Sequence, residues 1–315
     1  MSLRARVSAA LLGVLAILAT ACGAGGPLGG SQDPITIAVQ PTQTVAELTP
    51  SANEIADFLT QRVGRKVELV FPTSYAGVVE SLRFGHADAA FLSAWPARLA
   101  AKHAGADIGL AEVREVVIGQ DKKNETFYFS YWVVLPTSTV TKLEDLRGKR
   151  VAFSSQLSTS GYVAPLARLV ELGLVAKPAA GKEADPKTFF GEVLFAGGYS
   201  QAWTALKAGQ VDVAIIAGDV SESLYREVLA GTKVVDQQGP VPSHAVAFSK
   251  DLDAATKTKL KEALLALGDE QHRPLMRKFI SGIFVGFKET TAEEHLGALA
   301  RFLDLTNLAF VESLR

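Results

Sequence analysis

An internal repeat constrains the fold of this chain more than any other feature. Residues 67–96, VELVFPTSYAGVVESLRFGHADAAFLSAWP, align without a gap with residues 191–220, GEVLFAGGYSQAWTALKAGQVDVAIIAGDV, at an offset of 124. Each copy reads as strand, tight turn, helix, Gly-x-x-Asp turn and strand, which is the alternation of an α/β unit. We therefore expect two similar α/β units. The residues shared by the copies include the pairs Phe71 and Phe195, Tyr75 and Tyr199, Gly85 and Gly209, and Asp88 and Asp212.

The repeated tyrosines, Tyr75 and Tyr199, fall at a turn between the end of a strand and the start of a helix. In open α/β sheets this edge is where ligands bind, so both tyrosines are candidate ligand contacts. The alternative is that they only pack on the sheet. The repeated glycines are expected to end helices, and the repeated aspartates to occupy turns before strands.

The segments around the second copy predict how the two units are joined. FYFSYWVVL before it and TKVVDQQGPVPSHAVAFSKDL after it both read as extended chain, which suits two hinge strands that flank an inserted lobe. We place lobe one at residues 35–128 and 243–315, and lobe two at residues 129–242. The apolar spacing of three and four in residues 254–268 and 291–308 predicts helices, which we expect to pack on lobe one.

The N-terminus indicates export. Residues 1–22 have a basic start, an apolar core too short to span a membrane, and a small-residue end, which is the pattern of a signal peptide. Cys22 is the only cysteine, and LATAC resembles a bacterial lipobox, so we expect Cys22 to be lipidated. A plain secretory signal is the alternative. The Gly-rich residues 23–34 would then be a flexible tether.

Charge and cysteine content exclude several classes of protein. Removal of Arg4 and Arg6 with the signal leaves 30 basic and 33 acidic residues, a net charge of −3. The chain has no basic block, which argues against nucleic acid as a partner. With no second cysteine an internal disulfide is excluded.

A cluster of small hydroxyl residues marks the expected start of one helix. The stretch SSQLSTSGYVAP, residues 154–165, places Ser158, Thr159 and Ser160 directly before a helix that opens near Gly161. Helix starts have unpaired N–H groups and partial positive charge, which favour a bound anion. One of these hydroxyls is enough to cap a helix. On these residues alone, anion binding and capping remain equally open.

The motif STSGYVAP, preceded by KLEDLRGKRVAF, resembles the periplasmic phosphonate, phosphite and phosphate-binding proteins of ABC transporters. The likeness extends over nearly the whole mature chain and includes SYAGVVESLRFGHADAAF, YFSYWVVL and the AL-x-AGQVDVA unit. The resemblance implies an α/β, two-lobed periplasmic-binding-protein-like fold of type II. In this fold each lobe would be a mostly parallel sheet flanked by helices, and two hinge strands would join the lobes.

The resemblance also implies a set of ligand contacts. Hydroxyls and backbone amides at the helix start would hold the phosphonate oxygens, Tyr128 would donate its hydroxyl hydrogen to the ligand, and Tyr75 would close over the ligand from the first lobe. These residues are Ser158, Thr159, Ser160, Gly161, Tyr128 and Tyr75.

Three positions depart from the family pattern. Tyr199 stands where the family usually has a histidine that touches the oxyanion, and its hydroxyl can still donate. Asp219 stands where an aminophosphonate binder has glutamate, and His244 where such a binder has aspartate. Asp219 can accept a hydrogen bond from a protonated phosphoryl oxygen and repel sulfate, which offers no proton. His244 either donates to the anion, pairs with Asp219, or is a solvent-facing turn residue.

Together these features predict an extracytoplasmic solute-binding lipoprotein of an ABC importer that captures phosphonate, phosphite or phosphate. We expect a monomer, anchored at the outer face of the cytoplasmic membrane by lipid alone, with the permease and ATPase subunits as partners. The alternatives are a carrier of a sulfonate, a thiamine precursor or another small anion, or a ligand-sensing lipoprotein. A triad of Ser158, His244 and Asp219 is disfavoured because the chain has no G-x-S-x-G elbow, so we expect no enzyme. The scattered histidines predict no metal site, and we expect no cofactor.

Overall fold

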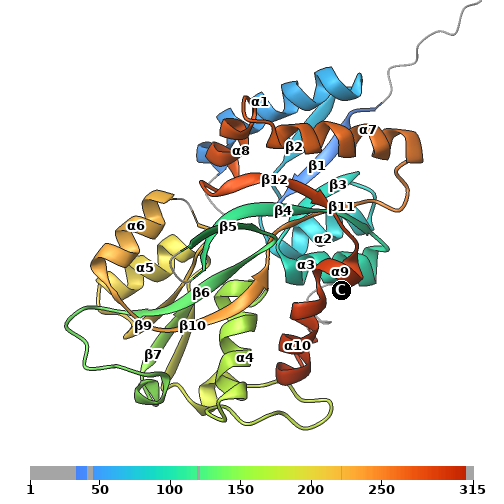
Figure 1. The fold of residues 1–315 in the computed structure, drawn as a ribbon. Helices are drawn as coiled ribbons and strands as arrows, with labels where there is room; N and C mark the ends of the chain where they lie inside the picture. Colours follow the sequence, from blue (N-terminus) through green and yellow to red (C-terminus); the bar gives the residue numbers. More distant parts are fainter. Residues whose placement is uncertain (1–32, 41–44, 119–120, 221, 310–315) are drawn as a thin grey trace, which may run out of the picture. The chain divides into compact units, whose positions relative to one another are not determined.

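Two β-sheets organise the chain in the computed structural model, which describes residues 33–40, 45–118, 121–220 and 222–309 (Figure 1). The first sheet has seven strands in the order β12-β4-β11-β3-β1-β2, with β5 paired to β4, and the second has five in the order β10-β6-β9-β7-β8. The strands of the first sheet are β1 Ile35–Val39, β2 Val67–Val70, β3 Ala89–Leu92, β4 Asp107–Ile118, β5 Asp121–Glu125, β11 Ala245–Phe248 and β12 Phe284–Glu289. Those of the second sheet are β6 Phe127–Val134, β7 Arg150–Phe153, β8 Glu192–Phe195, β9 Val213–Ala217 and β10 Lys233–Pro242.

Helices flank both sheets, which confirms the α/β class. The helices longer than one turn are α1 Val45–Val63, α2 Tyr75–Arg83, α3 Ala94–Leu99, α4 Ala164–Glu171, α5 Tyr199–Lys207, α6 Glu222–Gly231, α7 Ala254–Leu265, α8 Arg273–Phe279 and α10 Gly297–Thr306. The π-helical turns are η1 Ala100–Ala104 and η3 Thr159–Val163, and the remaining short turns are η2 Leu143–Leu146, η4 Pro186–Thr188, η5 Ala266–Gly268 and α9 Ala292–His295. None of the helices in these ranges has the length and apolar character needed to span a membrane.

The sheets are mixed in direction, so the prediction of mostly parallel sheets is wrong. β1 pairs with β2 and β3 in parallel, and β7 pairs with β8 and β9 in parallel. The strands β4, β5, β11 and β12 pair antiparallel in the first sheet, and β6 and β10 do so in the second. The two strands of each repeat copy, β2 and β3 or β8 and β9, flank a parallel strand that lies outside the copy. β3 and β9 also pair antiparallel, with β11 and β6.

The repeat predicted from the sequence is present in the structure. α2 and α5 begin and end at positions that differ by 124 residues. Gly85 and Gly209 follow these helices with φ angles of 71° and 67°, a backbone conformation that favours glycine. The matched aspartates each accept a hydrogen bond from a backbone N–H at the start of a neighbouring strand. Asp88 accepts from Thr36 N in β1, and Asp212 accepts from Arg150 N in β7. The expected helix stops and turns are thus confirmed.

The C-terminal helices divide between the two sheets. α7 and α8 pack with α1, and their apolar side chains share a core with β1 and β11 of the first sheet (Figure 1). α10 instead packs on α4 and β10, with Leu299 and Phe302 buried. The prediction that both C-terminal segments pack on lobe one is therefore wrong for α10.

Two sequence predictions are not tested by the fold. The signal peptide and Cys22 lie outside the described residues, as does the tether as far as residue 32. Residues 33–315 form one unit by their contacts, so the proposed lobe boundaries stay a prediction. The strands of the second sheet all lie between residues 127 and 242.

Candidate functional site

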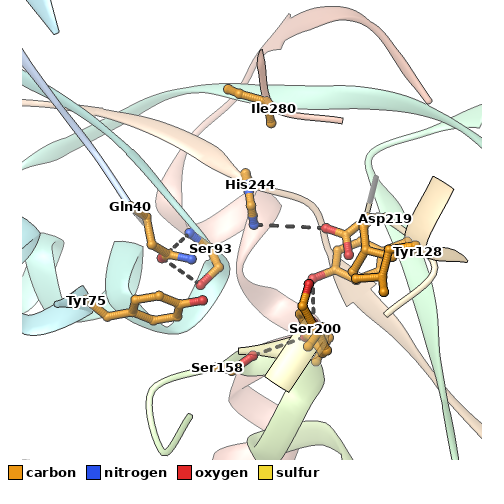
Figure 2. Close-up of a pocket in the computed structure, with 13 residues that line it drawn as sticks. Gln40, Tyr75, Ser93, Tyr128, Ser158, Ser200, Asp219, His244 and Ile280 are labelled. Carbon is orange, nitrogen blue, oxygen red and sulfur yellow. Dashed lines mark hydrogen bonds and ion pairs between the residues drawn. The ribbon is translucent and has the colours of Figure 1, made fainter. Parts of the chain in front are cut away.

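A cavity of about 60 Å³ is lined by residues from both sheets. One water needs roughly 10–15 Å³ measured in this way, so the space suits a molecule of a few heavy atoms. Figure 2 shows Tyr75, Ser93 and Gln40 on one side, Tyr128 and Asp219 on the other, and His244 between them. The lining residues are Gln40, Tyr75, Ser93, Tyr128, Ser158, Ser160, Tyr199, Ser200, Asp219, Val220, Leu224, His244 and Ile280.

The helix that follows β7 brings the predicted hydroxyl cluster to this cavity. Ser158 is its N-cap, and Ser158 Oγ accepts a hydrogen bond of 3.0 Å from Gly161 N. The π-helical turn η3 then leads directly into α4. A side chain at Gly161 would place its Cβ 1.9 Å from Ser154 Oγ, so the turn requires glycine. Capping by Ser158 is thus observed, and Ser158 also lines the cavity.

Hydroxyl groups from three elements meet at the cavity wall. Tyr199 OH lies 2.7 Å from Ser160 Oγ and 3.2 Å from Ser158 Oγ, and Tyr128 OH lies 2.8 Å from Ser160 Oγ. Burial, and secondly the nearby carboxylate of Asp219, raise the pKa of all the cavity tyrosines. For Tyr75, which completes the set, the pKa rises to about 12. These phenols therefore stay protonated and can donate hydrogen bonds to a guest.

Thr159 has a different role in the structure. Its side chain is fully buried, and Thr159 Oγ1 accepts a hydrogen bond of 2.8 Å from Trp95 N at the start of α3. Ser93 precedes α3, but Ser93 Oγ donates to Gln40 Oε1 and does not cap the helix. Thr159 thus caps α3 across the two sheets. Neither Thr159 nor Gly161 is among the cavity-lining residues.

A buried charged cluster, Glu112, Arg114 and Asp219, lies beside the cavity. Arg114 donates from Nη1 to Asp219 Oδ2, and from Nε and Nη2 to Glu112 Oε2 at 3.0 and 2.5 Å. Burial raises the pKa of Glu112 although Arg114 opposes the rise. Burial alone would lower the pKa of Arg114, but the two carboxylates outweigh it and raise that pKa. Of the three, Asp219 faces the cavity.

The sequence predictions missed Glu112, Arg114, Gln40 and Ser93. Glu112 and Arg114 lie two positions apart on β4 and so project to one face of the strand. A polar pair in an apolar strand is the signal that could have found them. Asp219, the second partner of Arg114, is 105 residues further along the chain than Arg114, and no local pattern indicates that contact.

His244 is buried beside this cluster. Its Nε2 lies 4.0 Å from Asp219 Oδ2, and its Nδ1 lies 3.8 Å from Glu112 Oε1. Burial, together with the positive charge of Arg114 and the neighbouring His295, holds the pKa of His244 well below 6.5. The imidazole is therefore neutral near pH 7. The alternative of a solvent-facing turn histidine is wrong.

The chemistry of the cavity is that of hydrogen-bond donation. None of its lining residues in the described part of the chain is a lysine or arginine. The hydroxyl of Ser158 pairs with Gly161 N and Tyr199 OH, so among the described residues it does not form the triad with His244 and Asp219. Trp95 and Trp203 are in the apolar core rather than at the cavity.

The sequence matches one family model over most of its length. Residues 37–295 match the family model described as "ABC transporter, phosphonate, periplasmic substrate-binding protein". The phosphate-import protein PhnD of Mycolicibacterium smegmatis is 31% identical over 204 residues, which are 63% of this chain and 61% of that protein. This chain thus spans less than two thirds of the length of that relative.

Solved structures with a similar fold cover most of the chain. A binding protein component of an ABC phosphonate transporter from Pseudomonas aeruginosa has a TM-score of 0.70 at 20% identity, covering 85% of both chains. PhnD1 of Prochlorococcus marinus, solved in complex with methylphosphonate, has a TM-score of 0.68 at 15% identity, covering 85% of this chain and 96% of that one. At these identities the likeness establishes the fold, that of type II periplasmic binding proteins.

Proposed function

The chain belongs to the family of periplasmic substrate-binding proteins of phosphonate ABC transporters, and from that premise we propose that it captures one phosphonate, phosphite or phosphate anion in the cavity described above. Its two sheets would close over the anion and deliver it to a membrane permease. The observation that carries the proposal is the convergence of serine and tyrosine hydroxyls on one small cavity at a helix start.

The donors at the cavity are sufficient for capture. Ser158, Ser160 and the tyrosines Tyr75, Tyr128 and Tyr199 each offer one hydroxyl that can rotate towards a guest. A hydrogen bond to a charged group contributes about 1.5–3 kcal/mol, whereas a micromolar affinity needs about 8 kcal/mol. Five such bonds contribute about 7.5–15 kcal/mol, and what exceeds about 8 kcal/mol offsets the entropic cost of capture and closure. Among the described residues that line the cavity there is no lysine or arginine, which favours release of the anion to a permease.

Other members of the predicted contact set take supporting roles. Thr159 holds α3 to the helix start, and Gly161 lets the turn pack on Ser154. Asp219 accepts a hydrogen bond from a protonated phosphoryl oxygen, which disfavours sulfate. His244, being neutral, offers one N–H to the anion or to Asp219.

The cellular setting follows from the family and from the N-terminal pattern. The protein works outside the cytoplasmic membrane, with the permease and ATPase subunits of an importer as partners. Lipidation of Cys22 would keep the protein at the membrane surface, and we expect the protein to be a monomer. It would bind and release its cargo without turnover, and so it is not an enzyme. A sulfonate or another small anion is the second candidate, and the acceptor Asp219 in the cavity argues against it.

Titration calorimetry of the mature protein tests this function. The panel is phosphite, phosphate, methylphosphonate, 2-aminoethylphosphonate, sulfate and taurine. We expect at least one phosphorus oxyanion to bind and Ser160→Ala to weaken it roughly tenfold or more. Ser155→Ala in the same loop is the control, since Ser155 does not line the cavity. Binding of sulfate or taurine with no response to any phosphorus compound would refute the proposal.

A further inference from the structure

The environment of Asp219 extends the proposed function to the charge state of the ligand. Asp219 is 9% exposed and is the only carboxylate among the cavity-lining residues of the described chain. An ionised carboxylate has no hydrogen to donate. An oxyanion beside it must therefore supply the shared proton or suffer repulsion from a like charge.

Arg114 holds this carboxylate from behind. Its side chain is fully buried, and its Nη1 donates to Asp219 while Nε and Nη2 donate to Glu112. Arg114 does not line the cavity, so Asp219 is the member of the ion pair that contacts a guest. Glu112 accepts from the other nitrogens of the guanidinium.

We propose that Arg114 is a positioning residue that sets specificity: it fixes Asp219 as an ionised acceptor, so that the cavity selects oxyanions that still carry a proton over fully ionised ones. This inference rests on the proposed function. The favoured ligands are monohydrogen forms of phosphorus oxyanions, and sulfate is the fully ionised counterpart.

Other titratable groups around Asp219 do not supply the proton that Asp219 and the oxyanion would share. The imidazole at 4.0 Å is neutral, and the phenols around the cavity are donors whose pKa values are raised. The groups that face Asp219 or its partners are Arg114 and Glu112 on β4, His244 between β10 and β11, Tyr75 on α2, Tyr128 on β6, Tyr199 on α5 and His295 on α9.

The test compares wild type with variants that remove one part of the cluster at a time. Glu112→Gln keeps Arg114 on Asp219 and is the control. Glu112→Gln with Arg114→Met leaves Asp219 without its cationic partner, and Asp219→Asn removes the acceptor charge. If the double variant does not fold, Glu112→Leu with Arg114→Met replaces it, because buried ionic partners can often be replaced by apolar residues of similar volume.

Calorimetry with phosphite and sulfate gives the first readout. We expect the control to keep the wild-type ratio of the two affinities, and both the Asp219→Asn and the Arg114 variants to lower it roughly 10- to 100-fold. An Arg114 variant that folds, binds phosphite and retains the wild-type ratio overturns the inference. Failure of wild type to bind any phosphorus oxyanion would instead overturn the proposed function.

Proton counting gives a second readout that a purely structural role would not change. Titrations near pH 8, where phosphite is a dianion, in buffers of different ionisation enthalpy report the protons taken up on binding. Wild type is expected to take up about one proton per bound phosphite, and Asp219→Asn none. Absence of uptake in wild type that binds phosphite also overturns the inference.

Discussion

The cross-sheet cap formed by Thr159 can be tested by replacing it with valine. Thr159 and Trp95 are 0% and 3% exposed, and their hydrogen bond of 2.8 Å satisfies an N–H in the first turn of α3. Ser93, the residue that precedes α3, donates its hydroxyl hydrogen to Gln40 Oε1 and so does not cap the helix. Valine has the same shape as threonine but no acceptor, so Thr159→Val leaves Trp95 N buried and unpaired.

The size of the effect follows from that single group. A buried donor left without a partner costs about 1–3 kcal/mol, and the cavity term is small because the volume is conserved. We therefore expect the free energy of unfolding of Thr159→Val to fall by about 1–3 kcal/mol. Thr306→Val is the matched control. Thr306 is also fully buried, but Thr306 Oγ1 donates to Phe302 O within α10, a carbonyl that the helix already engages.

Urea unfolding followed by circular dichroism measures both variants. The midpoint should shift while the slope with denaturant stays that of wild type, which separates stability from a change in compactness. If Thr159→Val is no more destabilised than Thr306→Val, the hydrogen bond to Trp95 does not stabilise the packing of the two sheets, and the reasoning fails.

Three further predictions concern the cavity and the helix start. Tyr199→Phe should weaken binding of the phosphorus oxyanion roughly tenfold or more in calorimetry, whereas Tyr162→Phe, which alters a core tyrosine outside the cavity, should leave the affinity within a factor of about two. The pKa of His244 in the folded protein lies below its unfolded value of 6.5. The free energy of unfolding should therefore decline as pH falls below about 6.5, because the unfolded imidazole takes up a proton there. His244→Gln should flatten this decline, and an unchanged slope would contradict the prediction. Gly161→Ala places a Cβ against Ser154 Oγ and should lower the free energy of unfolding by about 1–3 kcal/mol, measured by thermal unfolding. Gly297→Ala is the control, because its Cβ would meet nothing within 4 Å, and it should be neutral or slightly stabilising. Equal effects of the two variants would refute the steric argument.

The repeat made much of the fold predictable. Matching side chains at an offset of 124 predicted one helix in each copy, together with the glycines that end α2 and α5, and the two helices do begin and end at equivalent positions. These features are local, since a helix stop and a turn aspartate depend on neighbours in sequence. The strands outside the repeats carried no such signal, and the antiparallel pairs that they form made the sheets mixed.

The site was predictable where its chemistry is local and not where it is long-range. Ser158 and Ser160 were found because hydroxyls cluster at one helix start. The actual partner of Thr159 is an N–H 64 residues away, and Arg114 meets Asp219 across 105 residues. Such contacts depend on how the two sheets pack, which the motif alone does not encode.

A crystal structure of the mature protein with bound phosphite would show whether the cavity is the anion site. We expect the anion in the cavity between the two sheets, with its oxygens within about 2.5–3.2 Å of Ser158 Oγ, Ser160 Oγ and the hydroxyl of Tyr199. An anion held elsewhere on the protein while these hydroxyls still bond only to one another would contradict this expectation.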